Sequence, residues 1–325
     1  MRIPKSCLVV LAVLILFSSF AAASVIRTDR PDQRYLDLGA QPKYAAVGRL
    51  DIATVGGAYI GSGTLIAPNW VLTAAHCVDQ ATALTFTVGG TPYSATSWQA
   101  YPMWTGNLAA GYDIGLVRLS DAAAGVTPAK RYTGTSELGK KATFVGYGMT
   151  GTGKTGATIF DGLKRGVQNT LDTLYGKGRK AINRILLADF DNPNNRRDNE
   201  FGSATPLDLE GLIAPGDSGG GVFIDAGNSA LLAGVNSFGM AYDGKVDSDY
   251  GDMSGHTRVS AFNNWIDQIL AKDAAMSLAL MSAGAPNGDM SPQDSFGQIP
   301  EPASLSLLAL GGVLLACHRR HRRLN

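Results

Sequence analysis

The middle of the chain consists of short apolar runs separated by glycine, asparagine and aspartate. The clearest runs are VGRLDI, SGTLIAPNWVLT, LTFTVGG, IGLVRLS, ATFVGYG, GGVFID and LLAGVNSFG. Runs of this length that are rich in Val, Ile, Thr and aromatic residues, and that are bounded by turn residues, predict strands. Helical periodicity is scarce between them, so the sequence predicts an all-β sandwich or barrel.

The composition limits the classes of protein that fit. The 325 residues are 45% hydrophobic and 17% charged, which favours one large globular domain with appendages over a mainly disordered chain. The formal net charge is +1, which gives no overall electrostatic attraction for a polyanion. We therefore expect no nucleic-acid partner.

Residues 1–23 have the pattern of a secretory signal. Arg2 and Lys5 precede the apolar run CLVVLAVLILF, which is followed by SSFAAAS. A basic start, an apolar core and an Ala-x-Ala site predict cleavage by signal peptidase before Ser24. The alternative, a transmembrane anchor, fits less well because the run is short. We therefore expect the protein to be exported.

The last part of the chain differs from the middle. Residues 272–298 are predicted to form a flexible linker, which includes the stretch AGAPNGDMSPQDSFGQ. Residues 299–325 contain Pro-Glu-Pro, an apolar run from Ala303 to Cys317, and a cluster of Arg and His. Such a run is about the shortest that could span a bilayer, judged against the roughly 20 residues usually needed. The basic end favours the cytoplasmic side.

This tail resembles the PEP-CTERM sorting signal of Gram-negative bacteria. The resemblance implies recognition by an exosortase and removal of the tail during delivery to the surface. A plain C-terminal membrane anchor is the alternative. In both cases we expect the domain to lie outside the inner membrane, in the periplasm, at the cell surface or in the medium.

Residues 148–155, GMTGTGKT, match the phosphate-binding pattern G-x-x-x-x-G-K-[ST] letter for letter. A phosphate-binding loop opens a helix, but the following GATIFDGLKRG is glycine-rich and a poor helix start. An exported domain also has no routine supply of ATP. The residues therefore favour a surface hairpin loop with a solvated Lys154 over nucleotide binding.

Two short stretches offer an imidazole and an acid. Of the four histidines two lie in the tail, so imidazole chemistry in the domain must use His76 or His256. His76 ends the apolar run NWVLTAAHC, and Asp113 precedes the apolar strand IGLVRLS. A carboxylate at the edge of such a strand needs a partner, and an imidazole N–H fits that need. A core histidine and a turn-capping aspartate are the alternatives.

A third stretch, GDSGGG, offers a nucleophile. A serine hydroxyl is a weak nucleophile unless a base lies beside it, so Ser218 requires a partner such as His76. Glycines on both sides of Ser218 allow a sharp turn that directs backbone N–H groups at one point. Glycine-rich turns are common in β proteins, so this stretch alone is only suggestive.

In chain order, TAAHC, YDIGLVRL and GDSGG resemble the chymotrypsin/trypsin family of serine proteases. The order His, Asp, Ser distinguishes that family from subtilisins and α/β-hydrolases. The resemblance covers residues 45–270 and includes GYG, NSFG and TRVSAFNNWIDQIL. It implies an all-β protease domain over residues 24–271, with two six-stranded antiparallel β-barrels and a C-terminal helix. An N-terminal signal helix and a C-terminal hydrophobic tail helix are expected to flank this domain.

The resemblance also implies catalytic roles. Ser218 attacks the scissile carbonyl, His76 takes its proton, and Asp113 orients the imidazole and stabilises its charged form. The N–H groups of Gly216 and Ser218 form the oxyanion hole. The expected protein is therefore a serine endopeptidase that acts on a polypeptide substrate and needs no cofactor.

Substrate-binding residues follow from the same resemblance. Ser237, Phe238 and Gly239 are expected to pair with the substrate backbone as an added strand. Leu212 falls at the base of the pocket that selects the substrate side chain. Without an acid there, a Lys or Arg side chain would be buried unpaired. We therefore expect no selectivity for Lys or Arg, and favour apolar or small side chains.

The sequence departs from the family at two points. Cys77 lacks its usual disulfide partner, because the matching position is Gly61, and its thiol is expected to be a small buried apolar group. Family members are activated by a cleavage whose new Ile or Val amine pairs with the carboxylate before the nucleophile, here Asp217. No Arg/Lys-Ile-Val-Gly-Gly precedes residue 45, so a zymogen of this kind is not expected and the partner of Asp217 is left open.

Residues 151–205 are expected to form an insertion. Within it, DFDNPNNRRDNEFG at 189–202 is rich in Asp and Asn and could hold Ca²⁺. The spacing fits no calcium loop, so a solvated, turn-rich loop is favoured and no metal site is predicted.

Two other functions stay open. An α/β-hydrolase esterase would use Gly216-x-Ser218-x-Gly220 as its nucleophile elbow and His256 as base, with Asp243 or Asp249 as the acid. No alternation of strands and helices precedes the serine, which disfavours this hypothesis. The other alternative is a catalytically silent surface protein that uses the same fold for binding.

Overall fold

The computed structural model describes residues 24–176, 178, 181–227 and 229–283. The predicted signal at 1–23 and the predicted tail at 299–325 lie outside these residues. The chain divides into two units at Ala275/Met276. The described residues of the second unit are the end of one helix. None of the helices in the described part of the chain is long and apolar enough to cross a membrane.

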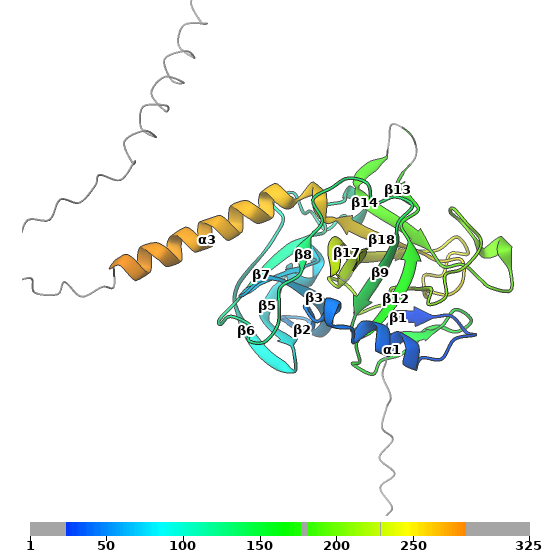
Figure 1. Cartoon of the computed structure of the whole chain (residues 1–325), viewed down its shortest axis with the longest axis horizontal. Helices are drawn as coiled ribbons and strands as arrows, with labels where there is room; N and C mark the ends of the chain where they lie inside the picture. Colours follow the sequence, from blue (N-terminus) through cyan, green and yellow to red (C-terminus); the bar gives the residue numbers. More distant parts are fainter. Residues whose placement is uncertain (1–23, 177, 179–180, 228, 284–325) are drawn as a thin grey trace, which may run out of the picture. The chain divides into compact units, whose positions relative to one another are not determined.

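Six antiparallel strands form a closed barrel in the order β2-β3-β4-β7-β6-β5 (Figure 1). Along β2 the side chains of Leu50 and Ile52 are buried and that of Asp51, between them, is more exposed, as the two-residue period of a strand requires. The first predicted barrel is therefore confirmed. Its strands are β2 (Val47–Thr54), β3 (Gly57–Ala67), β4 (Trp70–Thr73), β5 (Ala81–Val88), β6 (Thr91–Ala100) and β7 (Gly115–Leu119).

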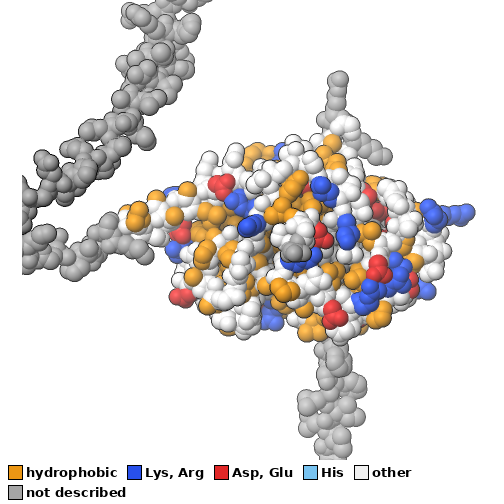
Figure 2. Space-filling view, viewed as in Figure 1, with side chains coloured by type: hydrophobic (Ala, Val, Ile, Leu, Met, Phe, Trp, Pro, Cys, Tyr) orange, Lys and Arg blue, Asp and Glu red, His pale blue; other side chains and the backbone are white. Residues whose placement is uncertain are grey.

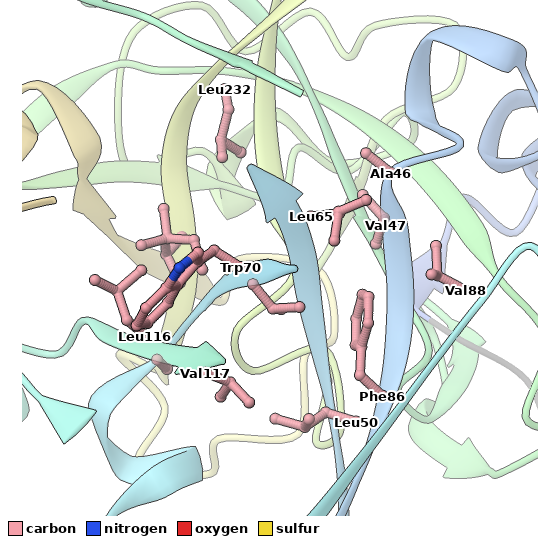
Figure 3. Close-up of a cluster of buried hydrophobic side chains, with 14 of the residues drawn as sticks. Ala46, Val47, Leu50, Leu65, Trp70, Phe86, Val88, Leu116, Val117 and Leu232 are labelled. Carbon is pink, nitrogen blue, oxygen red and sulfur yellow. The ribbon is translucent and has the colours of Figure 1, made fainter. Parts of the chain in front are cut away.

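The barrel interior is filled by branched and aromatic side chains from all its walls. Figure 3 shows Leu50, Leu65 and Phe86 in this interior, and all three are completely buried. Burying one such side chain contributes about 1.5–3 kcal/mol. Leu232, which belongs to the second half of the molecule, is part of the same cluster. One continuous core thus joins the two halves.

The second half is an eight-stranded sheet in the order β12-β9-β16-β17-β18-β14-β13, with β8 paired to β17. The predicted second six-stranded barrel is not found, because no ladder joins β12 to β14. The Asn169 amide bridges them instead, donating to the Asp189 carbonyl at 2.6 Å. The strands are β8 (Lys130–Arg131), β9 (Lys141–Gly146), β12 (Arg165–Thr170), β13 (Thr173–Tyr175), β14 (Ile182–Asp189), β16 (Gly221–Ala226), β17 (Ser229–Met240) and β18 (Met253–Arg258).

Strands β12, β13 and β14 fall within residues 151–205. That segment is therefore not an insertion outside the fold, as the sequence suggested, but supplies part of the main sheet. Glycine and polar residues interrupt the apolar pattern there, so its strands were missed. The part from 190 to 205 carries no strand and only a short 3₁₀ helix, η4 (Arg196–Asp198).

A third, four-stranded sheet has the order β11-β10-β1-β15. It contains β1 (Ser24–Ile26), β10 (Thr150–Thr152), β11 (Gly156–Ile159) and β15 (Gly211–Leu212). The phosphate-loop pattern at 148–155 forms the hairpin between β10 and β11, no helix follows it, and Lys154 is exposed. The predicted surface hairpin is confirmed, and the geometry of a phosphate-binding loop is absent from these residues.

Three α-helices accompany the sheets: α1 (Gln33–Gly39), α2 (Ala75–Val78) and α3 (Asn263–Ala283). The remaining 3₁₀ helices are η1 (Pro42–Tyr44), η2 (Leu108–Ala110) and η5 (Val259–Ala261). The predicted C-terminal helix is present as α3, but it continues past residue 271. Residues 272–283, assigned to the linker, are therefore helical, because they are rich in Ala, Leu and Met and contain no Gly or Pro.

Helix α3 is attached to the closed barrel through Asp273. Its carboxylate accepts hydrogen bonds from Trp70 Nε1 at 3.0 Å and from Arg118 Nε at 2.7 Å. Trp70 and Arg118 are paired residues on the neighbouring strands β4 and β7.

Basic and acidic side chains lie interspersed among apolar and neutral ones on the face that Figure 2 shows. Arg30 and Arg34 both pair with Asp208, and Lys43 pairs with Asp225. These ion pairs are partly exposed, and solvent screening leaves each of them a small contribution to stability.

Candidate active site

His76 and Asp113 are brought together at the end of the closed barrel. His76 lies in α2, directly after β4, and Asp113 lies two residues before β7, which pairs with β4. Asp113 is completely buried. It accepts from His76 Nδ1 at 2.8 Å and from the His76 backbone N–H at 2.9 Å. The predicted contact between the imidazole and the buried acid is therefore present.

Two further groups hold Asp113. The hydroxyl of Ser237 donates to its carboxylate, and the hydroxyl of Thr257 donates to its backbone carbonyl at 2.7 Å. Burial lowers the pKa of His76, whereas the hydrogen bond to Asp113 and the charge of its carboxylate raise it, and the net shift of the His76 pKa is upward. The site is thus built to stabilise a protonated imidazole.

Ser218 lies in the turn between β15 and β16 and faces the same cavity as His76. This cavity has a volume of about 800 Å³, and Ile60 and Cys77 also line it. A neighbouring cavity of about 750 Å³ is lined mainly by apolar groups and reaches Pro215 and Gly216. The family resemblance predicts that His76 and Ser218 lie in one cleft, and in the structure both residues line this cavity.

Two backbone N–H groups of this turn are unused. Among the described residues, no acceptor takes the N–H of Gly216 or of Ser218. In contrast, Asp217, Gly219 and Gly220 donate to Ala214, Asn236 and Asp217, respectively. Unpaired N–H groups beside a serine are donors that a negatively charged oxygen could use.

The direction of each free N–H is fixed by a hydrogen bond to the carbonyl of the same peptide group. The Pro215 carbonyl accepts from Met149 N–H at 2.6 Å, and the Asp217 carbonyl accepts from Gly220 N–H at 2.8 Å. Because C=O and N–H point in opposite directions in a trans peptide, these bonds turn the N–H groups of Gly216 and Ser218 the other way.

Gly216 and Gly219 are required by this turn. Their φ values are +95° and +84°, which L side chains rarely adopt. A Cβ on Gly216 would lie 2.8 Å from Gly148 Cα, and one on Gly219 would lie 2.0 Å from Thr73 Oγ1.

Ser62 on β3 also holds the turn, although no sequence motif singled it out. It is completely buried; its hydroxyl donates to the Gly216 carbonyl at 3.0 Å, and its N–H donates to the Ser218 carbonyl at 2.8 Å. The hydroxyl also accepts from Tyr147 N–H at 2.9 Å. A serine between two glycines, in GSGTLI, was the available signal.

Cys77 is a free, buried cysteine next to Gly61. A Cβ on Gly61 would lie 3.2 Å from the Cys77 sulfur, which agrees with the predicted pairing of these positions. The thiol donates a weak hydrogen bond to the Ser218 carbonyl at 3.6 Å. It therefore packs beneath the nucleophile as a small apolar group.

The predicted substrate-binding residues divide into two groups. Ser237, Phe238 and Gly239 lie near the end of β17, and Ser237 donates a hydrogen bond to Asp113. Leu212 is 1% exposed, pairs with Val25 across the β1–β15 ladder, and lines none of the cavities described for this part of the chain.

His256 lies in a different environment from His76. It is completely buried in β18, with Nε2 2.9 Å from Ser254 Oγ and Nδ1 3.1 Å from Asn236 Oδ1. Burial lowers its pKa to about 3. The sheet around it is antiparallel apart from the β8 edge, which is wrong for an α/β-hydrolase.

In the described part of the chain, the acidic stretch at 189–202 holds no group of three or more ligands close enough together to bind a metal ion. Among the described residues, Asp247, Asp249 and Asp252 form the one acidic group whose oxygens lie within 4.8 Å of one another. Lys245 pairs with Asp247 there.

A closed barrel and a second sheet that meet around a histidine, an aspartate and a serine define a class, the trypsin-like serine proteases. The family model for trypsin matches residues 45–266, which is more than half of the chain. The chain therefore belongs to the trypsin family.

Similar proteins support this assignment. Chymotrypsin-like elastase family member 1 of Felis catus is 28% identical over 237 residues, which cover 65% of this chain and 79% of the relative. The protein of the same name from Macaca fascicularis is 44% identical over 71 residues, which cover 18% and 27%. This family homology supports a serine peptidase.

Two solved structures share the fold. They are HL collagenase, with a TM-score of 0.53 and 19% identity, and mouse neuropsin, a serine protease, with 0.52 and 18%. Each match covers 72% of this chain, and 97% and 98% of the other chain, respectively.

Proposed function

We propose that this protein is an exported serine endopeptidase in which His76, Asp113 and Ser218 carry out acyl transfer. The observation that carries the proposal is the pairing of His76 Nδ1 with the fully buried carboxylate of Asp113. It leaves the other imidazole nitrogen for the cavity that Ser218 shares. A histidine held in this way can act as a general base towards a hydroxyl.

The reaction proceeds in two halves. Ser218 Oγ attacks the scissile carbonyl carbon while His76 takes the hydroxyl proton, and the resulting imidazolium is stabilised by Asp113. The substrate oxygen becomes negative and is bound by the free N–H groups of Gly216 and Ser218. His76 then gives the proton to the leaving amine, and water releases the acyl group by the same steps in reverse.

The arrangement of bonds around the turn supports the oxyanion role. Each such donor contributes about a 10²–10³-fold increase in rate when it is pre-positioned. The two N–H groups are pre-positioned because the carbonyls of Pro215 and Asp217 are already held by other residues.

The substrate is a polypeptide that pairs with Ser237, Phe238 and Gly239 as an added strand. No selectivity for Lys or Arg is expected, because a cation buried against mainly apolar groups would lack a partner. The apolar lining of the cavity next to Gly216 favours apolar or small residues in the substrate.

Export rests on the sequence at both ends. Signal peptidase removes residues 1–23. An exosortase-type enzyme processes the tail at 299–325, which anchors the protein to the membrane until then.

A fluorophosphonate probe tests this proposal. The mature protein should form an adduct on Ser218, located by mass spectrometry of its peptides, and the Ser218→Ala protein should form none. Ser229→Ala, on an exposed strand end, is the matched control and should label like the wild type. A folded wild-type protein without the adduct would instead favour a catalytically silent binding protein. A peptide library then defines the cleavage preference, and cleavage mainly after Arg or Lys contradicts the proposed specificity for apolar or small residues.

A further inference from the structure

A third cavity lies outside the catalytic cavity and has no role in the proposed reaction. Its volume is about 550 Å³, and its walls come from β13, β14, β17 and β18 (Figure 1) and from the loop at 200–202. Two carboxylates and three aromatic rings line it: Asp172, Glu200, Tyr175, Phe201 and Tyr242. A concave site with apolar and aromatic walls and a few polar groups has the composition of a binding site.

The two carboxylates of this cavity have no cation. No Lys, Arg or His side chain in the described part of the chain forms an ion pair with Asp172 or Glu200. Burial raises the pKa of Asp172 to about 7 and also raises the pKa of Glu200, and the negative charge of Asp189 adds to both shifts. The cavity therefore carries an excess of negative charge, which favours a positively charged ligand.

Both acids are held in place before any ligand enters. Asp189 Oδ2 accepts from the N–H groups of Glu200 at 2.6 Å and of Phe201 at 2.8 Å, which fixes the loop on one side of the cavity. Gly202 in the same loop has φ +61°, and a Cβ there would lie 2.4 Å from Asp172 Oδ1. Glycine thus lets the loop come close to the carboxylate of Asp172.

The cavity lies just beyond the segment that is expected to pair with the substrate. Met240 follows Gly239 in β17 and lines the cavity, and the ring of Tyr175 contacts that of Phe238 with centroids 6.1 Å apart. Met240 is three positions after Ser237, which bonds to the catalytic acid. At roughly 3.3 Å per residue this is about 10 Å of strand. A substrate strand paired with β17 therefore reaches the cavity a few residues away from its scissile bond.

The part of the substrate that reaches the cavity is the part before the scissile bond. In the proposed reaction His76 gives its proton to the leaving amine, so the part after the bond begins beside His76. The cavity at His76 is lined by residues of β2, β3 and α2 and by none of β17. The part before the bond is therefore the one that follows β17.

We propose that this third cavity binds a basic side chain of the polypeptide substrate, several residues before the scissile bond. The inference rests on the proposed function and names a feature of its substrate. A guanidinium or ammonium group supplies the positive charge that Asp172 and Glu200 lack. The three aromatic rings attract the same cation through their faces. The site is separate from the cavity next to Gly216, where an apolar or small side chain is expected.

Arginine fits this cavity best among the basic residues. Its planar guanidinium can stack on an aromatic ring and donate hydrogen bonds to a carboxylate at the same time, whereas the ammonium of lysine is a compact point charge. A charge-assisted hydrogen bond of this kind is stronger than one between neutral groups.

Matched peptides test the inference. A peptide with one apolar residue at its centre and small residues elsewhere is made with arginine, and in a second version with citrulline, at one position at a time before the apolar residue. Citrulline keeps the shape of the arginine side chain but carries no charge. At one of these positions the arginine peptide should have a kcat/KM at least about tenfold higher than the citrulline peptide, mainly through a lower KM.

Removal of the acids should remove this preference. Asp172→Asn and Glu200→Gln should each lower the ratio of the two kcat/KM values at least about threefold, and the double variant should bring the ratio close to unity. Asp37→Asn, on the exposed face of α1, is the matched control and should keep the wild-type ratio. Thermal unfolding confirms that each variant is folded. An unchanged ratio in the double variant, or no preference for arginine at any position, overturns the inference.

A binding measurement does not depend on hydrolysis. In isothermal titration calorimetry, the Ser218→Ala protein should bind the arginine peptide with a Kd at least about tenfold lower than that of the citrulline peptide. Addition of Asp172→Asn to this protein should abolish the difference. Equal dissociation constants at every arginine position overturn the inference. Tighter binding of the arginine peptide, with no hydrolysis of either peptide by the wild type, supports the site and contradicts only the peptidase assignment.

Discussion

Met149 N–H donates to the Pro215 carbonyl at 2.6 Å, and this bond fixes the direction of the Gly216 N–H in the same peptide. Met149 belongs to the stretch whose letters match a phosphate-binding pattern. In the structure its backbone serves the serine turn instead. The donors available to a substrate oxygen therefore depend on a segment that is remote from the GDSGG motif in sequence.

Replacement of Gly216 by alanine should disable this turn. Its φ of +95° strains any side chain, and the added Cβ would lie 2.8 Å from Gly148 Cα. We expect kcat/KM for an ester substrate to fall about 10²–10³-fold. Gly227→Ala, with φ +67° and no atom within 4 Å of its Cβ, carries a similar backbone strain in open space and serves as the control. Equal activity of the two variants would show that the turn tolerates the side chain.

Asp113→Asn should lower kcat by about 10⁴-fold with little change in KM. The carboxylate accepts from His76 Nδ1 and Ser237 Oγ at Oδ2 and from the His76 backbone N–H at Oδ1. An amide has one acceptor oxygen, so if that oxygen takes the bond from the His76 backbone N–H, its NH2 group faces Nδ1 and favours the wrong imidazole tautomer. Steady-state kinetics on a peptide ester measure the effect. Asp121→Asn, on the exposed surface, should behave like the wild type. A loss of less than tenfold in Asp113→Asn would remove Asp113 from the proposed mechanism.

The two histidines of the domain should respond differently to substitution. His76→Ala should abolish detectable hydrolysis. His256→Gln should retain most of kcat, because His256 is buried, stays neutral with a pKa near 3, and contacts only structural partners. We expect His256→Gln to lower the free energy of unfolding by about 1–3 kcal/mol, because it disturbs a buried hydrogen bond. Kinetics and urea unfolding of both variants provide the measurement, and the opposite result would make His256 the base.

Asp172 should make stability depend on pH. Burial and the neighbouring charges of Asp189 and Asp191 raise its pKa from 3.8 to about 7. Between pH 3.8 and about 7, Asp172 keeps its proton in the native state but has released it in the unfolded state. The free energy of unfolding therefore falls as the pH rises through this range, and this loss is complete above about pH 7. Asp172→Asn should therefore be more stable than the wild type at pH 8, by about 1 kcal/mol after allowance for solvent, and no more stable near pH 4.

Thermal unfolding across this pH range tests the Asp172 prediction. The matched control is Asp37→Asn, on the exposed face of α1, whose unfolding curve should keep the pH dependence of the wild type. The prediction would be contradicted if the wild-type stability rose between pH 5 and 7 and Asp172→Asn showed the same pH dependence.

Much of this architecture follows from local sequence. The strands of the closed barrel were predictable because they are short apolar runs bounded by turn residues, and the family resemblance predicted that they close into a barrel. The sites of His76, Asp113 and Ser218 were predictable because glycine and small residues mark the turns that carry them. The open form of the second sheet was not predictable, because the Asn169 side chain, and not a pairing of strands, links β12 to β14. Ser62 and Met149 contribute through hydrogen bonds to residues remote in sequence, which no local pattern records.

The attachment of α3 through Asp273 has a mechanical consequence. Its carboxylate holds donors on two adjacent strands, Trp70 and Arg118, so a pull on the chain beyond Asp273 is shared between β4 and β7. Tension from a tethered C-terminus would have to break both bonds together before it could strain the strand that leads to His76.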